Sequence, residues 1–192
     1  MNAAVRTIGV VGAARGHQVL GVRNGYEGLL AGNVVELTPP LLDGVARFGG
    51  TMLGSARSKE FPTVSGQKRA RARIAEHAID ALVVIGGNGS LTRAPVIGLP
   101  ASSDTDIGHT GRAIGVDTAV NTIVEACDRI SDTARAHRRA FIVEVMGRHC
   151  GFLAMRSGIA AEADAILYGE DPELTEDAVV ARLTAVLRQC FQ

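Results

Sequence analysis

The chain has 192 residues, 46% of them hydrophobic, which is enough to bury the core of one domain and argues against disorder. Its 20 basic and 20 acidic side chains balance, so net charge gives no reason to expect a nucleic-acid or membrane-surface partner. No apolar run approaches the ~20 residues that cross a bilayer, and the first residues lack the apolar core of a signal peptide.

The N-terminal part of the chain contains short β-branched runs separated by turn residues. Residues 7–11 and 19–22 are expected strands, but the seven residues between them are too few for the crossover that parallel strands require. They either form an antiparallel hairpin, or the first strand is displaced. Composition and apolar spacing then predict a turn, an edge strand and two helices, at residues 23–28, 34–37, 41–48 and 65–77. The basic residues of the last helix are expected on a solvated face.

A continuous apolar run at residues 81–85 is typical of a buried parallel strand. It leads directly into Gly86-Gly87-Asn88-Gly89-Ser90. Three glycines in four residues allow positive φ angles and a close approach of ligand to backbone N–H groups. Such a turn at the carboxyl edge of a sheet is a candidate phosphate site, although the pattern alone is weak.

A second short strand, residues 96–99, precedes Asp104 and Asp106. Alternate residues of an extended segment face the same way, so both carboxylates can point into one cleft; a solvated turn is the alternative. Only residues 91–94 separate the glycine turn from Pro95, a connection at the lower limit for a crossover, and Pro95 disfavours helix at Ala94.

The C-terminal half contains the clearest helix, residues 117–130, with Asp117 as its expected N-cap. Residues 140–145 and 165–167 are expected strands, and residues 151–161 and the segment from Pro172 onward are expected helices. Together these elements predict a three-layer αβα fold with a mostly parallel sheet. The cysteines, Cys127, Cys150 and Cys190, lack metal-ligand spacing, which predicts free thiols and a cytoplasmic protein.

Five motifs, in order over roughly residues 7–187, resemble the phosphofructokinase family. That family carries Gly-Gly-Asp-Gly-Ser, Pro-Gly-Thr-Ile-Asp-Asn-Asp and Met-Gly-Arg. Here the segments read Gly86-Gly-Asn-Gly-Ser90, Pro100-Ala-Ser-Ser-Asp-Thr-Asp106 and Met146-Gly-Arg148, with further matches at residues 49–57 and 125–133. NAD kinase and diacylglycerol kinase share a similar glycine turn, but the second and third motifs argue against them. The resemblance implies a single N-terminal lobe over residues 1–192, without the family's C-terminal lobe.

The resemblance also implies an ATP- and Mg²⁺-dependent 6-phosphofructokinase that makes fructose 1,6-bisphosphate in glycolysis. Asp104 would be the base at the sugar 1-hydroxyl, with Asp106 supporting the charge and the metal. The other implied sugar-phosphate contacts are Ser102, Ser103, Met146, Gly147 and Arg148, with Arg139 reaching a neighbouring subunit of a homo-oligomer. The implied nucleotide contacts are Tyr26, Arg57, Ser58, Gly87, Asn88, Gly89 and Ser90, and the implied metal residues are Asn88 and Asp106.

Several positions depart from the family pattern. Asn88 replaces a metal-binding aspartate, and a hard cation favours carboxylates, so metal binding should weaken. Thr105 replaces an asparagine, and the family's first glycine turn and helix have no evident counterpart. The family also has a crossover helix after the second glycine turn, so the short connection before Pro95 indicates a second deletion. Gly89 and Ala101 resemble the ATP-dependent branch rather than the pyrophosphate users. Two hypotheses therefore remain: an active kinase, or a non-catalytic relative that binds nucleotide or sugar phosphate weakly or joins another subunit.

Overall fold

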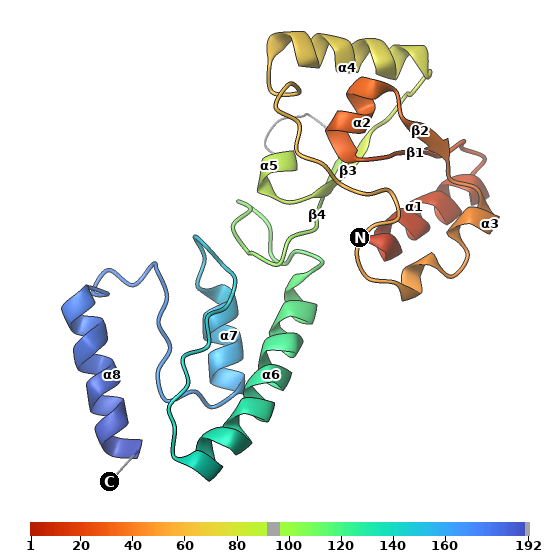
Figure 1. The fold of residues 1–192 in the computed structure, drawn as a ribbon. Helices are drawn as coiled ribbons and strands as arrows, with labels where there is room; N and C mark the ends of the chain where they lie inside the picture. The colour runs from red at the N-terminus through yellow and green to blue at the C-terminus, as the bar shows by residue number, and fades with distance from the viewer. Residues whose placement is uncertain (92–96, 191–192) are drawn as a thin grey trace. The chain divides into compact units, whose positions relative to one another are not determined.

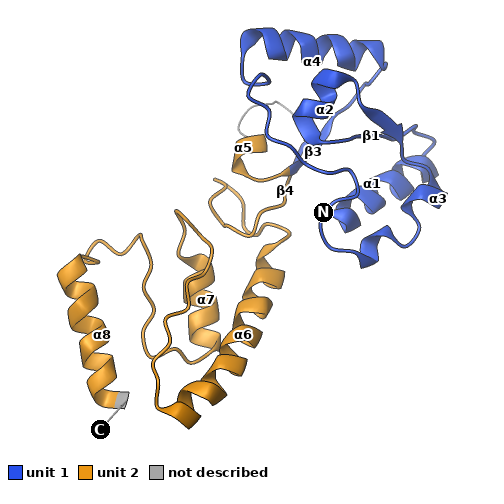
Figure 2. Cartoon of the chain, in the orientation of Figure 1, with its two compact units in different colours: residues 1–85, 93–98 blue, residues 86–92, 99–192 orange. Residues whose placement is uncertain are grey.

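The computed structural model describes residues 1–91 and 97–190, with helices and strands in the order drawn in Figure 1. The chain divides into two compact units, shown in different colours in Figure 2. The first is built mainly from residues 1–85 and the second mainly from residues 99 onward.

The first unit begins with helix α1, Asn2–Ala14, so the expected strand at residues 7–11 is wrong, and so are both alternatives built on it. Its two glycines explain the difference. A Cβ at Gly12 would lie 2.5 Å from Val19 Cγ2, and a Cβ at Gly9 would collide with the Leu42 side chain. The helix therefore packs closely through its glycine face. Val10 and Val11, the β-branched residues between the glycines, belong to this helix and not to a strand.

Strands β1, Leu20–Val22, and β2, Val34–Glu36, pair antiparallel with Leu20 opposite Glu36, which confirms both expected strands. The turn expected at residues 23–28 is limited to residues 23–24, because helix α2, Gly25–Ala31, begins directly after Asn24, which lies in the left-handed region at φ 59°. Helix α4, Val64–Glu76, confirms the expected helix, and the Thr63 side chain caps it by accepting from the Gly66 N–H at 3.0 Å. The core between α2 and α4 consists of Leu29, Leu30, Phe61 and Ala70.

The single helix expected at residues 41–48 is instead two short turns, α3 at Pro39–Leu42 and the 3-10 helix η1 at Val45–Arg47. Gly44 separates them because it adopts φ 69°, which interrupts helical geometry. Leu42 is 1% exposed and packs with Val5 and Leu37 in a second small core.

Strands β3, Val83–Gly86, and β4, Ile97–Pro100, form a parallel pair, and the short helix α5, Asn88–Leu91, follows β3. The fold class is therefore α/β, as expected. Among the described residues each sheet has two strands, so β3 has a neighbour on one side only and is not central. The predicted deletion before Pro95, and Val96 of the expected second strand, fall outside the described residues.

The second unit contains helices α6, Val116–His137, α7, Phe152–Ala160, and α8, Glu176–Cys190. The first two pack together around Ala113, Val116 and Leu153 (Figure 1). Gly115 is the N-cap of α6, so Asp117 lies in its first turn and is not the expected cap. In the described part of the chain every helix is too short or too polar to cross a membrane.

Residues 140–145 and 165–167 are not strands in this structure, contrary to expectation. Both lie outside regular secondary structure, and neither has a ladder partner among the described residues. Three apolar side chains of the first segment are open to solvent, with Phe141 47%, Ile142 85% and Val143 42% exposed, whereas Val145 packs against the core of α6 and α7. Cys127 and Cys150 have free thiols, as predicted.

Candidate active site

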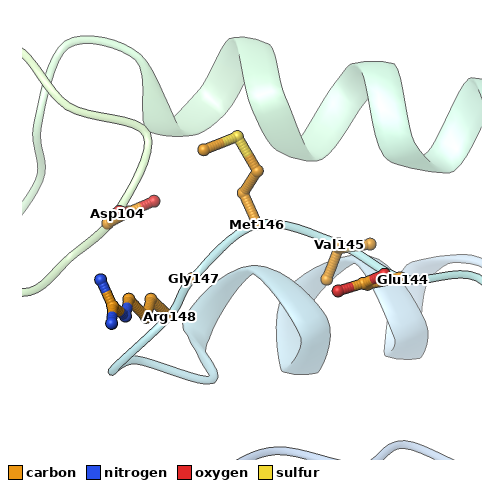
Figure 3. Close-up of a pocket in the computed structure, with 6 residues that line it drawn as sticks. All are labelled: Asp104, Glu144, Val145, Met146, Gly147 and Arg148. Atoms are coloured by element: carbon orange, nitrogen blue, oxygen red, sulfur yellow. The ribbon is translucent and has the colours of Figure 1, made fainter.

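A pocket of about 430 Å³ lies in the second unit (Figure 3). It brings together two segments that are 40 residues apart in the chain, and it is lined by Asp104, Glu144, Val145, Met146, Gly147 and Arg148. Figure 3 shows the Arg148 side chain extending toward the Asp104 side of the pocket. A carboxylate and a guanidinium thus border the same space.

The loop that carries Asp104 is fixed by backbone hydrogen bonds to the start of α6. The Ser102 carbonyl accepts from the Gly115 N–H at 3.1 Å, and the Pro100 carbonyl accepts from the Ile114 N–H at 2.9 Å. Within the loop the Ser102 hydroxyl oxygen accepts from the Asp104 N–H at 3.1 Å. The Ser103 hydroxyl donates to Asp104 Oδ1 at 3.2 Å, which leaves Oδ2 as a further acceptor.

The glycine turn lies next to this loop. The Gly86 carbonyl accepts from the Ala101 N–H at 2.9 Å, and a Cβ at Gly87 would lie 3.6 Å from Ser102 Cβ. The Gly87 carbonyl accepts from the Ser90 N–H at 3.0 Å, which starts the single helical turn of α5. A Cβ at Gly89 would meet nothing within 4 Å, so that backbone is open to a ligand.

The third predicted motif, Met146-Gly-Arg148, forms a tight turn at the pocket. Gly147 has φ 122°, and its carbonyl accepts from the Cys150 N–H at 3.0 Å, so Arg148 and His149 are the corner residues. Arg148 is exposed, and within the described residues it forms no ion pair. Its guanidinium is therefore available to an anionic ligand.

The remaining predicted site residues do not line this pocket. Asp106 is half-buried near Asp104, and Arg139 is exposed just after α6. In the first unit the Tyr26 ring stacks on Phe61 with centroids 3.7 Å apart, and burial raises the pKa of the Tyr26 phenol. Arg57 is exposed in a loop, and the Ser58 hydroxyl oxygen accepts from the Phe61 N–H at 3.2 Å.

Sequence reasoning missed Glu144 and Val145 as pocket residues. They fell inside the expected strand at residues 140–145, where the apolar residues drew attention. The available indication was that Glu144 is the one charged side chain in that apolar run, two residues before Met146.

Mg²⁺ is usually held by one or two carboxylates together with substrate phosphates, and it keeps several waters. In the described part of the chain no group of three or more His, Cys, Asp or Glu residues is placed to hold a metal ion. Asp104 and Asp106 do provide two half-buried carboxylates two residues apart. Between them the Thr105 hydroxyl is buried and has no hydrogen-bond partner among the described residues. This set fits a metal that arrives on nucleotide phosphates.

The sequence profile of the family described as Phosphofructokinase matches residues 1–189. The chain belongs to the phosphofructokinase family. It is 47% identical over 181 residues to an ATP-dependent 6-phosphofructokinase of Thermotoga petrophila, a match that covers 90% of this chain and 57% of the relative. An enzyme of the same name from Brevibacillus brevis is 44% identical over 98% of this chain and 61% of its own. The chain thus spans somewhat over half the length of these curated relatives.

Solved structures give the same assignment. A Pichia pastoris phosphofructokinase, crystallised in the T-state, matches 98% of this chain and 24% of its own with a TM-score of 0.87 and 34% identity. A Saccharomyces cerevisiae phosphofructokinase matches 85% of this chain and 26% of its own with a TM-score of 0.81 and 38% identity. A pyrophosphate-dependent phosphofructokinase of Nitrosospira multiformis matches 96% of this chain and 54% of its own with a TM-score of 0.77. Its sequence identity is 19%, so this match supports the fold alone.

Proposed function

We propose that this chain contributes the nucleotide side and part of the sugar side of a 6-phosphofructokinase that phosphorylates fructose 6-phosphate with ATP in glycolysis. The observation that carries the proposal is the shared pocket of Asp104 and the turn at Met146–Arg148, two motifs 40 residues apart. The names of the curated relatives, all ATP-dependent 6-phosphofructokinases, support the choice of reaction.

In the proposed reaction the oxygen of the sugar 1-hydroxyl forms a bond to the γ-phosphorus of ATP, and ADP leaves. Asp104 accepts the hydroxyl proton, since its Oδ2 has no partner among the described residues. Arg148 binds the sugar phosphate substrate through its exposed guanidinium, supported by the backbone of Met146 and Gly147. These groups position the acceptor, which is the main contribution that phosphoryl transfer requires of a protein.

The phosphoryl donor is proposed to lie over the glycine turn. The backbone of Gly87, Gly89 and Ser90 would hold its phosphates, with Ser102 and Ser103 on the adjacent loop. Mg²⁺, carried by the nucleotide and approached by Asp106 and Asn88, would neutralise phosphate charge. Gly89 and Ala101 favour ATP over pyrophosphate. In the first unit the proposed donor contacts are Tyr26, Arg57 and Ser58. Arg139 is proposed to reach the sugar phosphate of a second subunit in a cytoplasmic homo-oligomer.

A coupled assay of the purified chain with ATP, Mg²⁺ and fructose 6-phosphate tests this function. We expect slow formation of fructose 1,6-bisphosphate that Asp104→Ala reduces by ~10²- to 10⁴-fold, because a general base is lost. Asp132→Ala on the exposed face of α6 is the matched control and should leave the rate unchanged. Turnover that persists in Asp104→Ala would refute the assigned role.

One observation favours the second candidate, a non-catalytic module that binds nucleotide or sugar phosphate. The exposed residue that opens α5 is Asn88, which lacks the charge of a metal-binding carboxylate. Calorimetry separates the two functions. Saturable binding of fructose 6-phosphate or ATP without any product in the coupled assay would establish the binding module, and the absence of both binding and turnover would refute both.

A further inference from the structure

We propose that Glu170 is a positioning residue for Arg148, acting through the turn at residues 147–150 and the start of α7. The expected change in KM rests on the proposed function. The statement that Glu170 fixes the turn beneath Arg148 does not depend on it. Glu170 lies 22 residues after Arg148 and does not line the pocket, and no sequence motif includes it.

The Glu170 carboxylate receives a forked hydrogen bond from one backbone amide. The Gly151 N–H donates to Oε1 at 2.7 Å and to Oε2 at 2.8 Å. Gly151 is the N-cap residue of α7, whose first N–H groups have no partner within the helix. A carboxylate suits this position because hydrogen bonds to an ionised acceptor are strong and because the helix dipole favours negative charge there.

The close approach of this carboxylate depends on glycine. A Cβ at Gly151 would lie 2.9 Å from Tyr168 Cγ and 3.0 Å from Glu170 Oε2, and it would collide with Tyr168 Cβ. About two turns further along α7, a Cβ at Gly158 would lie 2.7 Å from Ile166 Cγ1. The segment of residues 166–170 therefore runs against α7 at two sites where a side chain is absent, and Glu170 ends that contact.

The capped amide belongs to the residue that directly follows the Arg148 turn. The Cys150 N–H donates to the Gly147 carbonyl at 3.0 Å and closes the turn, with Arg148 as its first corner residue. At the other end of the turn, Gly147 has φ 122° and a Cβ there would collide with the Cys150 carbonyl. The backbone beneath Arg148 is thus fixed by glycine conformation on one side and by Glu170 on the other.

Loss of the Glu170 carboxylate should weaken binding of the sugar phosphate more than binding of the nucleotide. Loss of the cap frees the Gly151 amide and lets the backbone at residues 148–150 move, while the loop with Asp104 keeps its own hydrogen bonds to α6. A small misplacement of a substrate-positioning group costs up to ~10²-fold. Glu170→Ala should therefore raise KM for fructose 6-phosphate by about 10-fold or more, and should leave KM for ATP within about twofold.

Three variants of the full chain test the proposal. Glu170→Ala removes the acceptor, and Glu170→Gln keeps one carbonyl oxygen and the side-chain length. Glu173→Gln removes a charge from the same segment at an exposed side chain and serves as the control. The measurements are the two KM values, the affinity for fructose 6-phosphate by calorimetry, and hydrogen exchange of the Gly151 amide by NMR.

We expect fast exchange of the Gly151 amide and weakened sugar-phosphate binding in Glu170→Ala, partial recovery in Glu170→Gln, and no change in Glu173→Gln. Equal loss in both KM values, or a lower kcat alone, would indicate general destabilisation and overturn the proposal. An unprotected Gly151 amide in the wild-type chain would overturn it as well. If the wild-type chain neither binds fructose 6-phosphate nor turns it over, the proposed function fails, and the exchange data still decide whether Glu170 fixes this turn.

Discussion

The side chain of Asn2 joins the start of α1 to the loop before Arg57, and its removal should destabilise the first unit. Asn2 is 5% exposed. Its Nδ2 donates to the Phe48 carbonyl at 2.9 Å and to the Gly49 carbonyl at 3.2 Å, and its Oδ1 accepts from the Met52 N–H at 2.6 Å. A net contribution of about 1 kcal/mol per hydrogen bond gives a loss of about 2–4 kcal/mol for Asn2→Ala.

An isosteric variant separates hydrogen bonding from packing. Asn2→Asp has nearly the same shape, but its second oxygen would face the Phe48 and Gly49 carbonyl oxygens. At pH 7 it should therefore lose at least as much stability as Asn2→Ala. The loss should shrink as the pH falls toward ~4 and be smallest below it, because a protonated carboxyl can donate again and the folded-state pKa lies above the unfolded value of ~4.

Urea unfolding followed by circular dichroism measures the loss, and hydrogen exchange by mass spectrometry locates it in residues 2–14 and 48–53. Thr7→Ala is the control, since the exposed Thr7 hydroxyl donates only to the Ala3 carbonyl in the same helix. It should change stability by less than about 0.5 kcal/mol. If Asn2→Ala and Asn2→Asp both stay within that range, the argument from buried hydrogen bonds is wrong.

Two other substitutions have expected outcomes. Asn88→Asp should increase Mg²⁺ affinity in calorimetry with ATP present while restoring little turnover, because a carboxylate replaces a neutral amide at one position only. The control is Asn121→Asp at an exposed position of α6. Equal gains in Mg²⁺ affinity in both variants would show that residue 88 has no special role. Burial raises the pKa of Tyr26 above its unfolded value of about 10, so stability should fall as the pH rises through and beyond 10. Tyr26→Phe should flatten that fall between pH 9 and 11 in denaturation midpoints, and an unchanged fall in Tyr26→Phe would refute the assignment to this phenol.

Local pattern predicted two parts of the candidate site, the glycine turn after one apolar run and the carboxylate pair after another. Met146-Gly-Arg148 was predicted from the family resemblance alone. Asp104 and Arg148 line the same pocket, as the shared cleft predicts, and their catalytic roles stay predictions. The metal, nucleotide and subunit roles of the other predicted residues stay predictions.

Local pattern failed where long-range contacts decide the structure. Residues 7–11 were interpreted as a strand from their β-branched composition, yet the contacts of Gly9 with Leu42 and of Gly12 with Val19 make a helix the better-packed choice. Residues 140–145 were also predicted as a strand, but they lie outside regular secondary structure. Their composition favours a strand, but a strand also needs a ladder partner, and their own sequence does not specify one.

The cap of α6 shows why the position of Asp104 could not be derived from the polar residues alone. Asp117 has the better capping side chain, but the chain uses Gly115, whose N–H donates to the Ser102 carbonyl. A Cβ at Gly115 would lie 2.8 Å from that carbonyl oxygen, so a larger residue would push the loop with Asp104 away from α6. At Gly147 and Gly151 the missing side chain likewise permits a close approach, to the Cys150 carbonyl and to Tyr168 respectively. The proposed chemistry of this site therefore depends on Asp104 and Arg148, whereas its geometry depends on glycines that a search for reactive side chains would pass over.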